Sequence, residues 1–371
     1  MINLFEPDVG NEELGAIGKV FESKWLGRGE IAREFNDKFA SYLNIDEEKI
    51  YTVSSCSDAI RIIMETLKYE LKGGGTFIVP VNSFPVVPSA IIKNGFKVRF
   101  CDIDPKNGNI CLQDLERKID NNTIGVFVTD YGGNPAPIGK IREINKNLII
   151  ACDSACALGS FSNSGLAVGL DADFAVWSFD AMKLLICGEG GGVYIKDKKL
   201  MDKFKSISYL GLPSSDTSGL SKMNESSEWW RYDIETPSYR SVFTDYHAAC
   251  GLVQLGKINK KLHKKRSIRE IYKEKLKVDY LNNSVEEHSN YFFTIRSNNR
   301  DYIAKSLKES GVYCSLRYWR MDKTNIIKFT EWPTNMPGAD IFYNKCLNIP
   351  IHANLSNNDV SYICEVINKN K

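Results

Sequence analysis

The sequence predicts an α/β protein: a large domain built on a mostly parallel sheet, followed by a smaller α+β domain. Between residues 50 and 200, short and nearly continuous apolar runs alternate with segments of helical periodicity. This alternation is typical of a parallel sheet covered by helices on both faces. After residue 245 the pattern changes to one long helix followed by short strands and helices. We therefore expect two domains in this 371-residue chain, residues 1–245 and 246–371.

The spacing of apolar residues predicts the elements of the large domain. Ser57–Lys72 is expected to be a helix with one apolar stripe, and Ser57 or Asp58 can cap its start. Two further helices are expected at Leu112–Ile119 and Ile138–Asn145. Six apolar runs are expected to be strands: Thr76–Pro80, Lys97–Ile103, Ile124–Thr129, Asn147–Cys152, Phe174–Phe179 and Gly192–Lys196.

The C-terminal part is predicted to begin with a long helix from Tyr246 to about Lys277. We interpret the Lys and Arg residues at 260–269 as a solvated face of this helix. A strand, a helix and a second strand are then expected at Tyr291–Arg296, Asp301–Ser310 and Val312–Trp319. Leu210–Glu235 lacks periodicity and is rich in polar residues, so we expect a long loop of the kind that is often functional.

Composition argues against several classes of protein. Lys and Arg number 48 against 46 Asp and Glu, without the basic excess or basic stripe that a nucleic-acid-binding protein usually carries. The ten cysteines form no CxxC pair and indicate free thiols of a reducing compartment, and the four histidines are too scattered to predict a metal site. No apolar run reaches membrane-spanning length, and no secretory signal is visible. We expect a cytoplasmic protein.

Three segments near the predicted strand ends carry side chains suited to chemistry, and ligands of open parallel sheets bind at the carboxyl ends of strands. Asp153 follows one strand and is either a buried carboxylate with a cationic or donor partner, or a helix N-cap or turn aspartate. Lys183 lies before apolar residues that we expect to lower its pKa; it is either a Schiff-base lysine or a lysine that snorkels to the surface. Residues 54–59 open a helix and form either a phosphate site or an ordinary cap.

One cofactor accounts for all three segments. Pyridoxal phosphate (PLP) needs a lysine for its aldehyde, an anion for its ring nitrogen and an anion-binding turn for its phosphate. Phe84 is a candidate to lie flat against the ring, although core packing would explain it equally well.

The same segments resemble the DegT/DnrJ/StrS family of PLP-dependent nucleotide-sugar aminotransferases, which have fold type I. The most specific match is Ser178-Phe179-x-x-x-Lys183-x-x-x-x-Gly188-Glu189-Gly190-Gly191. Weaker matches occur in the family's order along nearly the whole chain: Gly27–Glu30 with Phe35 and Phe39, Ser55–Ala59, Val79-Pro80 with Phe84, Phe100–Asp104, Gly133–Ala136, Asp153–Gly159, Tyr239-Arg240, Ala248–Leu255 and Leu347–His352.

The resemblance implies a role for individual residues. Lys183 would carry the cofactor and move the proton in transamination, while Asp153 would pair with the ring nitrogen. Ser178, Ser57 and the backbone of Cys56 would bind the phosphate, and Phe84 would stack on the ring. Family members share their sites across a homodimer near the positions of Ser238, Tyr239 and Arg240. The run that contains Trp229 and Arg231 could grip a nucleotide, although an aromatic dimer contact is favoured slightly.

The chain also departs from the family pattern. Cys56 and Ser57 replace the usual Gly-Thr, Cys156 stands where a glutamine near the cofactor's phenolic oxygen is common, and Asp130 stands where a histidine is common. Pro137 and Ser238 replace a common aspartate and asparagine. Lys183 itself favours transamination, because the family's dehydratases have histidine there.

The expected function is therefore transfer of an amino group from L-glutamate to a nucleoside-diphosphate keto-deoxysugar, most simply a 4-keto-6-deoxyhexose. The cofactor would alternate between PLP and pyridoxamine phosphate in ping-pong fashion. Three alternatives stay open: a 3-keto-sugar or non-sugar aminotransferase, a PLP lyase of the same fold, and a PLP-binding regulatory protein without turnover.

Overall fold

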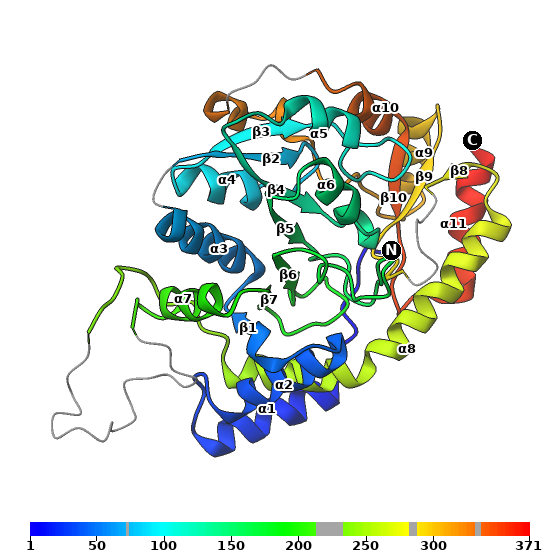
Figure 1. Cartoon of the computed structure of the whole chain (residues 1–371). Coiled ribbons are helices and arrows are strands. Elements are labelled where there is room, and N and C mark those ends of the chain that lie inside the picture. The colour runs from blue at the N-terminus through cyan, green and yellow to red at the C-terminus, as the bar shows by residue number, and fades with distance from the viewer. Residues whose placement is uncertain (72–73, 213–232, 282–287, 331–334) are drawn as a thin grey trace.

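A seven-stranded sheet forms the centre of the computed structural model, which describes residues 1–71, 74–212, 233–281, 288–330 and 335–371 (Figure 1). The strand order is β1-β7-β6-β5-β4-β2-β3. Neighbouring strands from β3 to β6 are parallel, whereas β7 is antiparallel to both β6 and β1. The strands are β1 (Ile50–Val53), β2 (Thr76–Pro80), β3 (Lys97–Cys101), β4 (Thr123–Thr129), β5 (Ile149–Asp153), β6 (Phe174–Ser178) and β7 (Gly191–Ile195).

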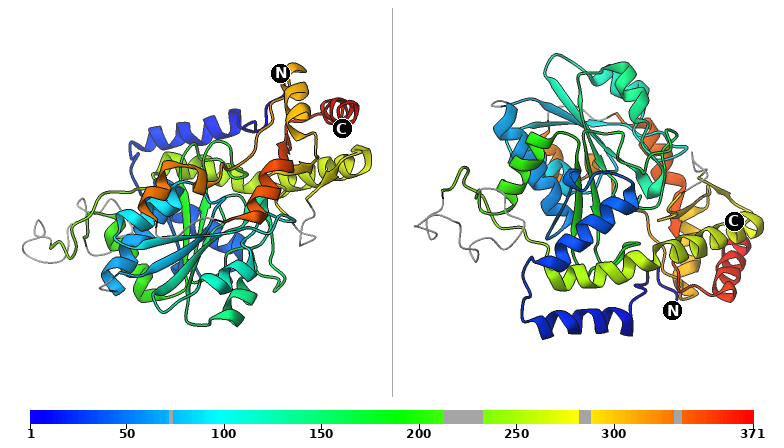
Figure 2. Two further views of the ribbon diagram at one scale, coloured as in Figure 1. Left: turned by 90° about the horizontal axis from the view of Figure 1, so that it is seen from above. Right: turned by 60° about the horizontal axis from the view of Figure 1, so that its bottom comes forward.

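Helices cover both faces of this sheet (Figures 1 and 2). One apolar core lies beneath α3 (Cys56–Leu71), α4 (Val86–Lys93) and α7 (Lys198–Ser208). The core on the other face includes residues of α2 (Glu30–Leu43), α5 (Leu112–Lys118), α6 (Ile138–Ile144) and α8 (Asp245–Lys275). The strands are buried along almost their whole length, as their apolar sequences predict.

The C-terminal part has a core of its own around a three-stranded antiparallel sheet in the order β10-β9-β8. Its strands are β8 (Asp279–Tyr280), β9 (Phe293–Arg296) and β10 (Cys346–Ile349). Its helices are α9 (Arg300–Glu309), α10 (Pro337–Lys345) and α11 (Asn357–Lys369). The remaining elements are α1 (Asn11–Ser23), which packs along α8 (Figure 2), and short 3-10 helices at Glu47–Lys49, Tyr131–Gly133, Met321–Lys323 and Asn325–Phe329.

Helix α8 contributes to both parts of the molecule. Ile258 and Leu262 belong to a core of the large sheet, whereas Ile268 and Tyr272 belong to the core of the small sheet. The predicted domain boundary at residues 245/246 therefore falls at the start of an element that the two cores share.

The predicted fold class is confirmed: a mostly parallel α/β sheet with a smaller antiparallel sheet near the C-terminus. The six strands predicted in the large domain all form, and the long helix predicted from Tyr246 is α8. The interpretation of its basic run as a solvated face is wrong for two residues. Lys261 and Lys265 are 5% and 6% exposed, because this side of α8 faces the large domain. The Lys261 ammonium donates to the carbonyl of Leu184 at 3.3 Å.

The strand predicted at Val312–Trp319 is not formed. Among the described residues, isolated bridges alone join this segment to its neighbours, between Val312 and Ile2 and between Ser315 and Asn348. Side chains satisfy the backbone beyond Ser315: Asn348 Oδ1 accepts from the N–H of Arg317 at 2.8 Å, and the Tyr131 hydroxyl donates to the carbonyl of Arg317. The apolar spacing of the segment predicted a strand, but side-chain hydrogen bonds replace the ladder.

Candidate active site

A cavity of about 340 Å³ opens beyond the carboxyl ends of β4, β5 and β6. This is the edge at which ligands bind in open parallel sheets. The cavity gathers all seven residues that the sequence assigned to the cofactor: Cys56, Ser57, Phe84, Asp153, Cys156, Ser178 and Lys183. They are brought together from strand ends and turns that lie far apart in the chain.

Asp153 is the last residue of β5, and its carboxylate lies in the cavity wall. The side chain is 5% exposed and accepts a hydrogen bond from the N–H of Ala155 at 3.1 Å. Burial raises the pKa of Asp153, and this hydrogen bond and the charge of Lys183 oppose the increase. A buried carboxylate of this kind gains stability from a cationic or proton-donating partner in the cavity.

Lys183 follows β6 and lies among weakly acidic groups. Its Nζ is 3.6 Å from the Sγ of Cys156 and 4.7 Å from the ring centroid of Tyr291. Burial lowers the pKa of Lys183, but the nearby Cys156, Tyr318, Tyr291 and Asp153 outweigh burial and raise this pKa well above its usual value. The lowered pKa predicted from the apolar residues after Lys183 is therefore wrong. The tertiary neighbours, not the local sequence, determine the direction.

The start of α3 forms the anion-binding end of the cavity. The hydroxyl of Ser55 accepts from the N–H of Asp58 at 3.0 Å, so Ser55 is the cap, where the sequence suggested Ser57 or Asp58. Within the described ranges, the N–H groups of Cys56 and Ser57 and the Ser57 hydroxyl have no hydrogen-bond partner. They are available to an anion at the positive end of the α3 dipole.

Glycine lets β7 approach this turn closely. A Cβ added at Gly191 would lie 2.6 Å from the backbone nitrogen of Cys56 and 2.7 Å from the carbonyl of Ser55. Such contacts are too short for any side chain, so the turn can hold its position only because residue 191 is glycine. The Gly-Glu-Gly-Gly run after Lys183 thus supports the anion-binding turn sterically.

Aromatic side chains flank the cavity. Phe84 is 40% exposed, and its ring meets the ring of Tyr318 edge to face at a centroid distance of 4.9 Å. The Tyr318 hydroxyl lies 3.7 Å from the Sγ of Cys156, and burial raises the pKa of this hydroxyl well above its usual value. Phe84 therefore faces the cavity and is not a core residue.

Comparison with known proteins shows the family to which this chain belongs. The sequence profile of the DegT/DnrJ/EryC1/StrS aminotransferase family matches residues 7–368. The chain belongs to this family. It is accordingly a PLP-dependent enzyme of the nucleotide-sugar aminotransferase family.

Individual relatives cover nearly the full length. A dTDP-4-dehydro-2,3,6-trideoxy-D-glucose 4-aminotransferase of Saccharopolyspora spinosa is 33% identical over 380 residues, which cover 100% of this chain and 96% of the relative. The crystal structure of the aminotransferase TlmJ from Streptoalloteichus hindustanus has 30% identity and a TM-score of 0.90, with 100% and 98% of the two chains covered. Spr1654 of Streptococcus pneumoniae, solved in a pyridoxamine-phosphate form, shares the fold at 24% identity, with a TM-score of 0.90 over 100% of this chain and 98% of that one.

The residues of the cavity fit the cofactor of the DegT/DnrJ/EryC1/StrS family. Amide and hydroxyl donors of Cys56 and Ser57 have no partner of their own among the described residues at one end. The Thr129 hydroxyl, which lines the same cavity at the end of β4, is also buried without a hydrogen-bond partner in the part of the chain that the structure describes. A primary amine and a buried carboxylate complete the set. These groups match a phosphate, a polar ring substituent, an aldehyde and a ring nitrogen.

The departures from the family pattern are also placed. Cys156 lies between Lys183 and Tyr318 in the cavity. Asp130 is completely buried and accepts from the Ser154 hydroxyl at 2.6 Å and from the N–H of Ala136 at 2.7 Å. Burial raises the pKa of Asp130 to about 6. Asp130 therefore joins the segments that follow β4 and β5 and does not line the cavity.

The residues predicted to contact substrate lie elsewhere. Ser238, Tyr239 and Arg240 are outside the cavity: the Ser238 hydroxyl donates to Glu65 at 3.3 Å, and the Arg240 guanidinium lies 5.5 Å from the ring centroid of Tyr209. Tyr239 is 74% exposed. Trp229 and Arg231 lie outside the described residues.

Thr129, Tyr291, Arg317 and Tyr318 also line the cavity and were not singled out from the sequence. Thr129 ends β4, and the strand-end reasoning that identified Asp153 would have found it. The other three belong to the C-terminal part and carry no local signal, since only tertiary folding brings them to the large sheet.

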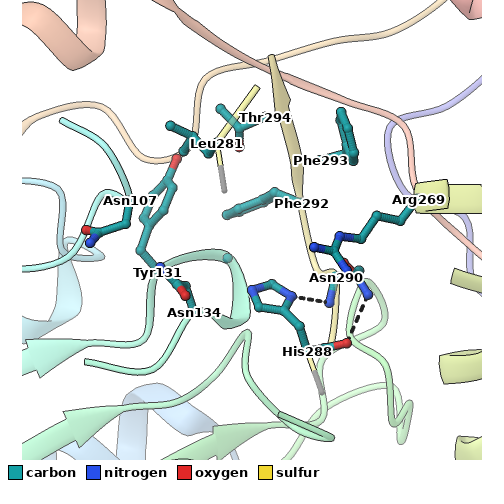
Figure 3. Close-up of a pocket in the computed structure, with 11 residues that line it drawn as sticks. Asn107, Tyr131, Asn134, Arg269, Leu281, His288, Asn290, Phe292, Phe293 and Thr294 are labelled. Carbon is teal, nitrogen blue, oxygen red and sulfur yellow. Dashed lines mark hydrogen bonds between the residues drawn. The ribbon is translucent and has the colours of Figure 1, made fainter. Parts of the chain in front are cut away.

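Another, much smaller cavity of about 20 Å³ lies between the turn that follows β4 and strand β9 (Figure 3). It has space for roughly one water molecule and none for a cofactor. His288 lines it and is joined to Asn290 by two hydrogen bonds, one from the Asn290 N–H to the histidine Nδ1 at 2.8 Å. The described residues contain no group of three or more His, Cys, Asp or Glu that could hold a metal ion, and none of their helices is long and apolar enough to cross a membrane.

Proposed function

We propose that this enzyme transfers an amino group from L-glutamate to a 4-keto-6-deoxyhexose linked to a nucleoside diphosphate. One observation carries the proposal: Lys183 and Asp153 line the same cavity as the free donors at the start of α3. The relative from Saccharopolyspora spinosa, named for amination at C4 of a dTDP-linked deoxysugar, supports the choice of carbon and of substrate class.

Each residue of the cavity has a distinct task in this proposal. PLP, when bound, supplies an electron sink and a temporary carrier for the amino group. Lys183 holds the cofactor and moves a proton with its Nζ, and Asp153 keeps the proton on the ring nitrogen in place. Cys56 and Ser57 at the start of α3, with the Ser178 hydroxyl, bind the phosphate, and Phe84 covers the ring.

The raised pKa of Lys183 has a consequence for this task. An ammonium has no lone pair, so Lys183 must lose a proton before it can act as a nucleophile or a base. Asp153 is one of the groups that raise this pKa, and it would stabilise the ammonium less when its own charge is paired with the ring nitrogen of bound PLP.

The visible spectrum of the PLP-loaded protein, taken before and after addition of L-glutamate, tests the proposal. We expect an absorption band of the lysine-linked cofactor that glutamate bleaches, and a keto-sugar nucleotide that restores it with formation of an amino-sugar. A band that ignores glutamate would refute this donor. Release of ammonia or pyruvate in place of amine exchange would identify a lyase.

We also propose that the active form is a homodimer whose subunits complete each other's cavities. The exposed Tyr239 and its neighbours Ser238 and Arg240, placed outside the cavity of their own chain, support this arrangement. Mixing Lys183→Ala subunits with Arg240→Ala subunits tests it. If each variant is inactive alone, equal amounts that assort at random should recover about a quarter of the wild-type activity, because about half of the dimers are mixed and each mixed dimer has one intact site. A monomeric, fully active protein would contradict the proposal.

A further inference from the structure

Arg317 is the one arginine that lines the cavity, among the residues that the structure describes. Lys183 is the other cation of the lining, and the proposed function already uses its amine. The acidic groups of the lining are Asp153, Asp180 and Glu189. A donor such as glutamate brings two carboxylates into a cavity that is rich in negative charge, so a cation other than Lys183 is needed to bind it.

The fold holds Arg317 in place from both sides. Its N–H donates to Oδ1 of Asn348 in β10, and its carbonyl accepts from the hydroxyl of Tyr131. Its guanidinium lies 5.1 Å from the ring centroid of Phe5, close enough for a cation–π contact. The backbone and the guanidinium are thus both positioned before any ligand arrives, which lowers the entropic cost of binding.

The guanidinium of Arg317 has no carboxylate partner within the described ranges of the chain. Arg320, three residues later, provides the contrast: its guanidinium bonds to both carboxylate oxygens of Asp322 and to Asp340. Arg320 is neutralised and structural, whereas Arg317 keeps its donors for a ligand. A planar guanidinium is the side chain best suited to two parallel hydrogen bonds with a carboxylate.

We propose that Arg317 binds a carboxylate of the amino donor. This inference rests on the proposed function in naming glutamate, but not in naming the chemistry: the ligand group is a carboxylate that enters the same cavity as Lys183. A diphosphate of the sugar nucleotide is the other anion that a guanidinium would recognise, and the experiment separates the two.

Calorimetric titration of the PLP-loaded protein with glutarate tests this assignment directly. Glutarate has both carboxylates of glutamate but no amino group, so its binding does not depend on turnover. Arg317→Gln should weaken glutarate binding on the order of 10- to 100-fold, as expected for charge-assisted hydrogen bonds. Arg317→Lys, which keeps the charge without the fork, should fall between. Binding of thymidine diphosphate should stay unchanged in both variants.

Arg117→Gln is the matched control, since the exposed Arg117 pairs with Asp114, outside the cavity. It should bind glutarate like the wild type. Circular dichroism and the melting temperature establish that the Arg317 variants fold. In the glutamate half-reaction, Arg317→Gln should raise KM for glutamate more than it lowers kcat, as loss of uniform binding requires.

Three results would overturn the inference: wild-type protein that does not bind glutarate, Arg317→Gln that binds it as tightly as the wild type, or loss of thymidine diphosphate binding with glutarate binding intact. The last would assign Arg317 to the sugar nucleotide. If Arg317→Gln loses glutarate while glutamate fails to bleach the wild-type band, the carboxylate assignment stands and the proposed amino transfer falls. If glutamate bleaches the band while Arg317→Gln binds glutarate normally, the amino transfer stands and the carboxylate assignment falls.

Discussion

The Nζ of Lys183 lies 3.6 Å from the Sγ of Cys156, whose thiol is in turn 3.7 Å from the hydroxyl of Tyr318. A reactive amine, a thiol and a phenol from three distant segments thus form a row within one cavity. Burial raises the pKa of both Cys156 and Tyr318, and the charge of Lys183 opposes the increase in each. The reactive group of the row is the lysine.

Borohydride reduction of the PLP-loaded protein should therefore attach the cofactor to Lys183. Lys265 is the informative competitor, because burial lowers its pKa to about 7 and its Nζ also lies near the ring of Tyr291, at 5.5 Å. Peptide mass spectrometry separates the two positions. Lys183→Ala should lose both the adduct and amino transfer while keeping its circular dichroism, and an adduct on Lys265 in the wild type would contradict the assignment.

Asp153→Asn should reduce amino transfer by at least about 100-fold, the scale of loss when a single electrostatic contact at a reacting group is removed. The fold should survive, because an asparagine carbonyl can still accept from the N–H of Ala155 and because burial disfavours the native carboxylate charge. Steady-state kinetics and a thermal melt check the two halves of this prediction. Near-normal rates would remove Asp153 from the mechanism.

Gly191→Ala should weaken cofactor retention. The added Cβ would collide with the backbone of Ser55 and Cys56, and the anion-binding turn would have to move. We expect destabilisation of about 1–3 kcal/mol and PLP loss on dialysis. Gly256→Ala is the control: it lies in α8 with no atom within 4 Å of its added Cβ, and it should stabilise the protein by up to about 1 kcal/mol. Equal PLP retention in the two variants would rule out steric support of the turn.

Stability should fall with acidification through the titration of His288. Burial, with help from Arg269, Lys265 and Arg266, lowers its pKa from 6.5 to about 3. Between these values the unfolded chain binds a proton that the folded chain does not, so stability is fully present above about pH 6.5 and falls by up to about 1.4 kcal/mol for each pH unit below.

His288→Asn should make the free energy of unfolding less dependent on pH in this range, because asparagine does not titrate there. The variant should fold, since its amide oxygen can replace Nδ1 as the acceptor from Asn290. Asp130, with its pKa raised to about 6, changes the stability in the opposite direction between pH 3.8 and 6. The quantity to measure is therefore the difference in free energy of unfolding between variant and wild type, obtained by denaturant unfolding from pH 7 to pH 4. The exposed His263→Asn should follow the wild type, and parallel curves for His288→Asn would contradict the prediction.

Much of the cavity could be predicted because its residues end predicted strands. Asp153 and Ser178 are each the last residue of a buried parallel strand, and all such ends meet at one edge of the sheet. No such rule reaches Arg317. Its position depends on Tyr131, which is 186 residues away in sequence, and on Asn348 of the small sheet. A segment held by side chains carries no periodic signature.

The burial of Lys261 and Lys265 was unpredictable for another reason. Their spacing of four places both on one face of α8, which the sequence allows. Which face is covered depends on tertiary packing against the large domain, where Leu184 supplies an acceptor for Lys261. The local charge of the helix predicted that these lysines are exposed to solvent, whereas the packing of the two parts of the molecule buries them.

Helix α8 packs into one core through Ile258 and Leu262 and into the other through Ile268 and Tyr272, so a continuous helix connects the two cores. The C-terminal part brings Arg317 and Tyr318 to the cavity. A movement of that part that opens the cavity must therefore shift or bend α8 and disturb the packing of both cores. Truncating the chain at the start of α8 would expose part of the apolar core on one face of the large sheet, because α8 residues belong to that core.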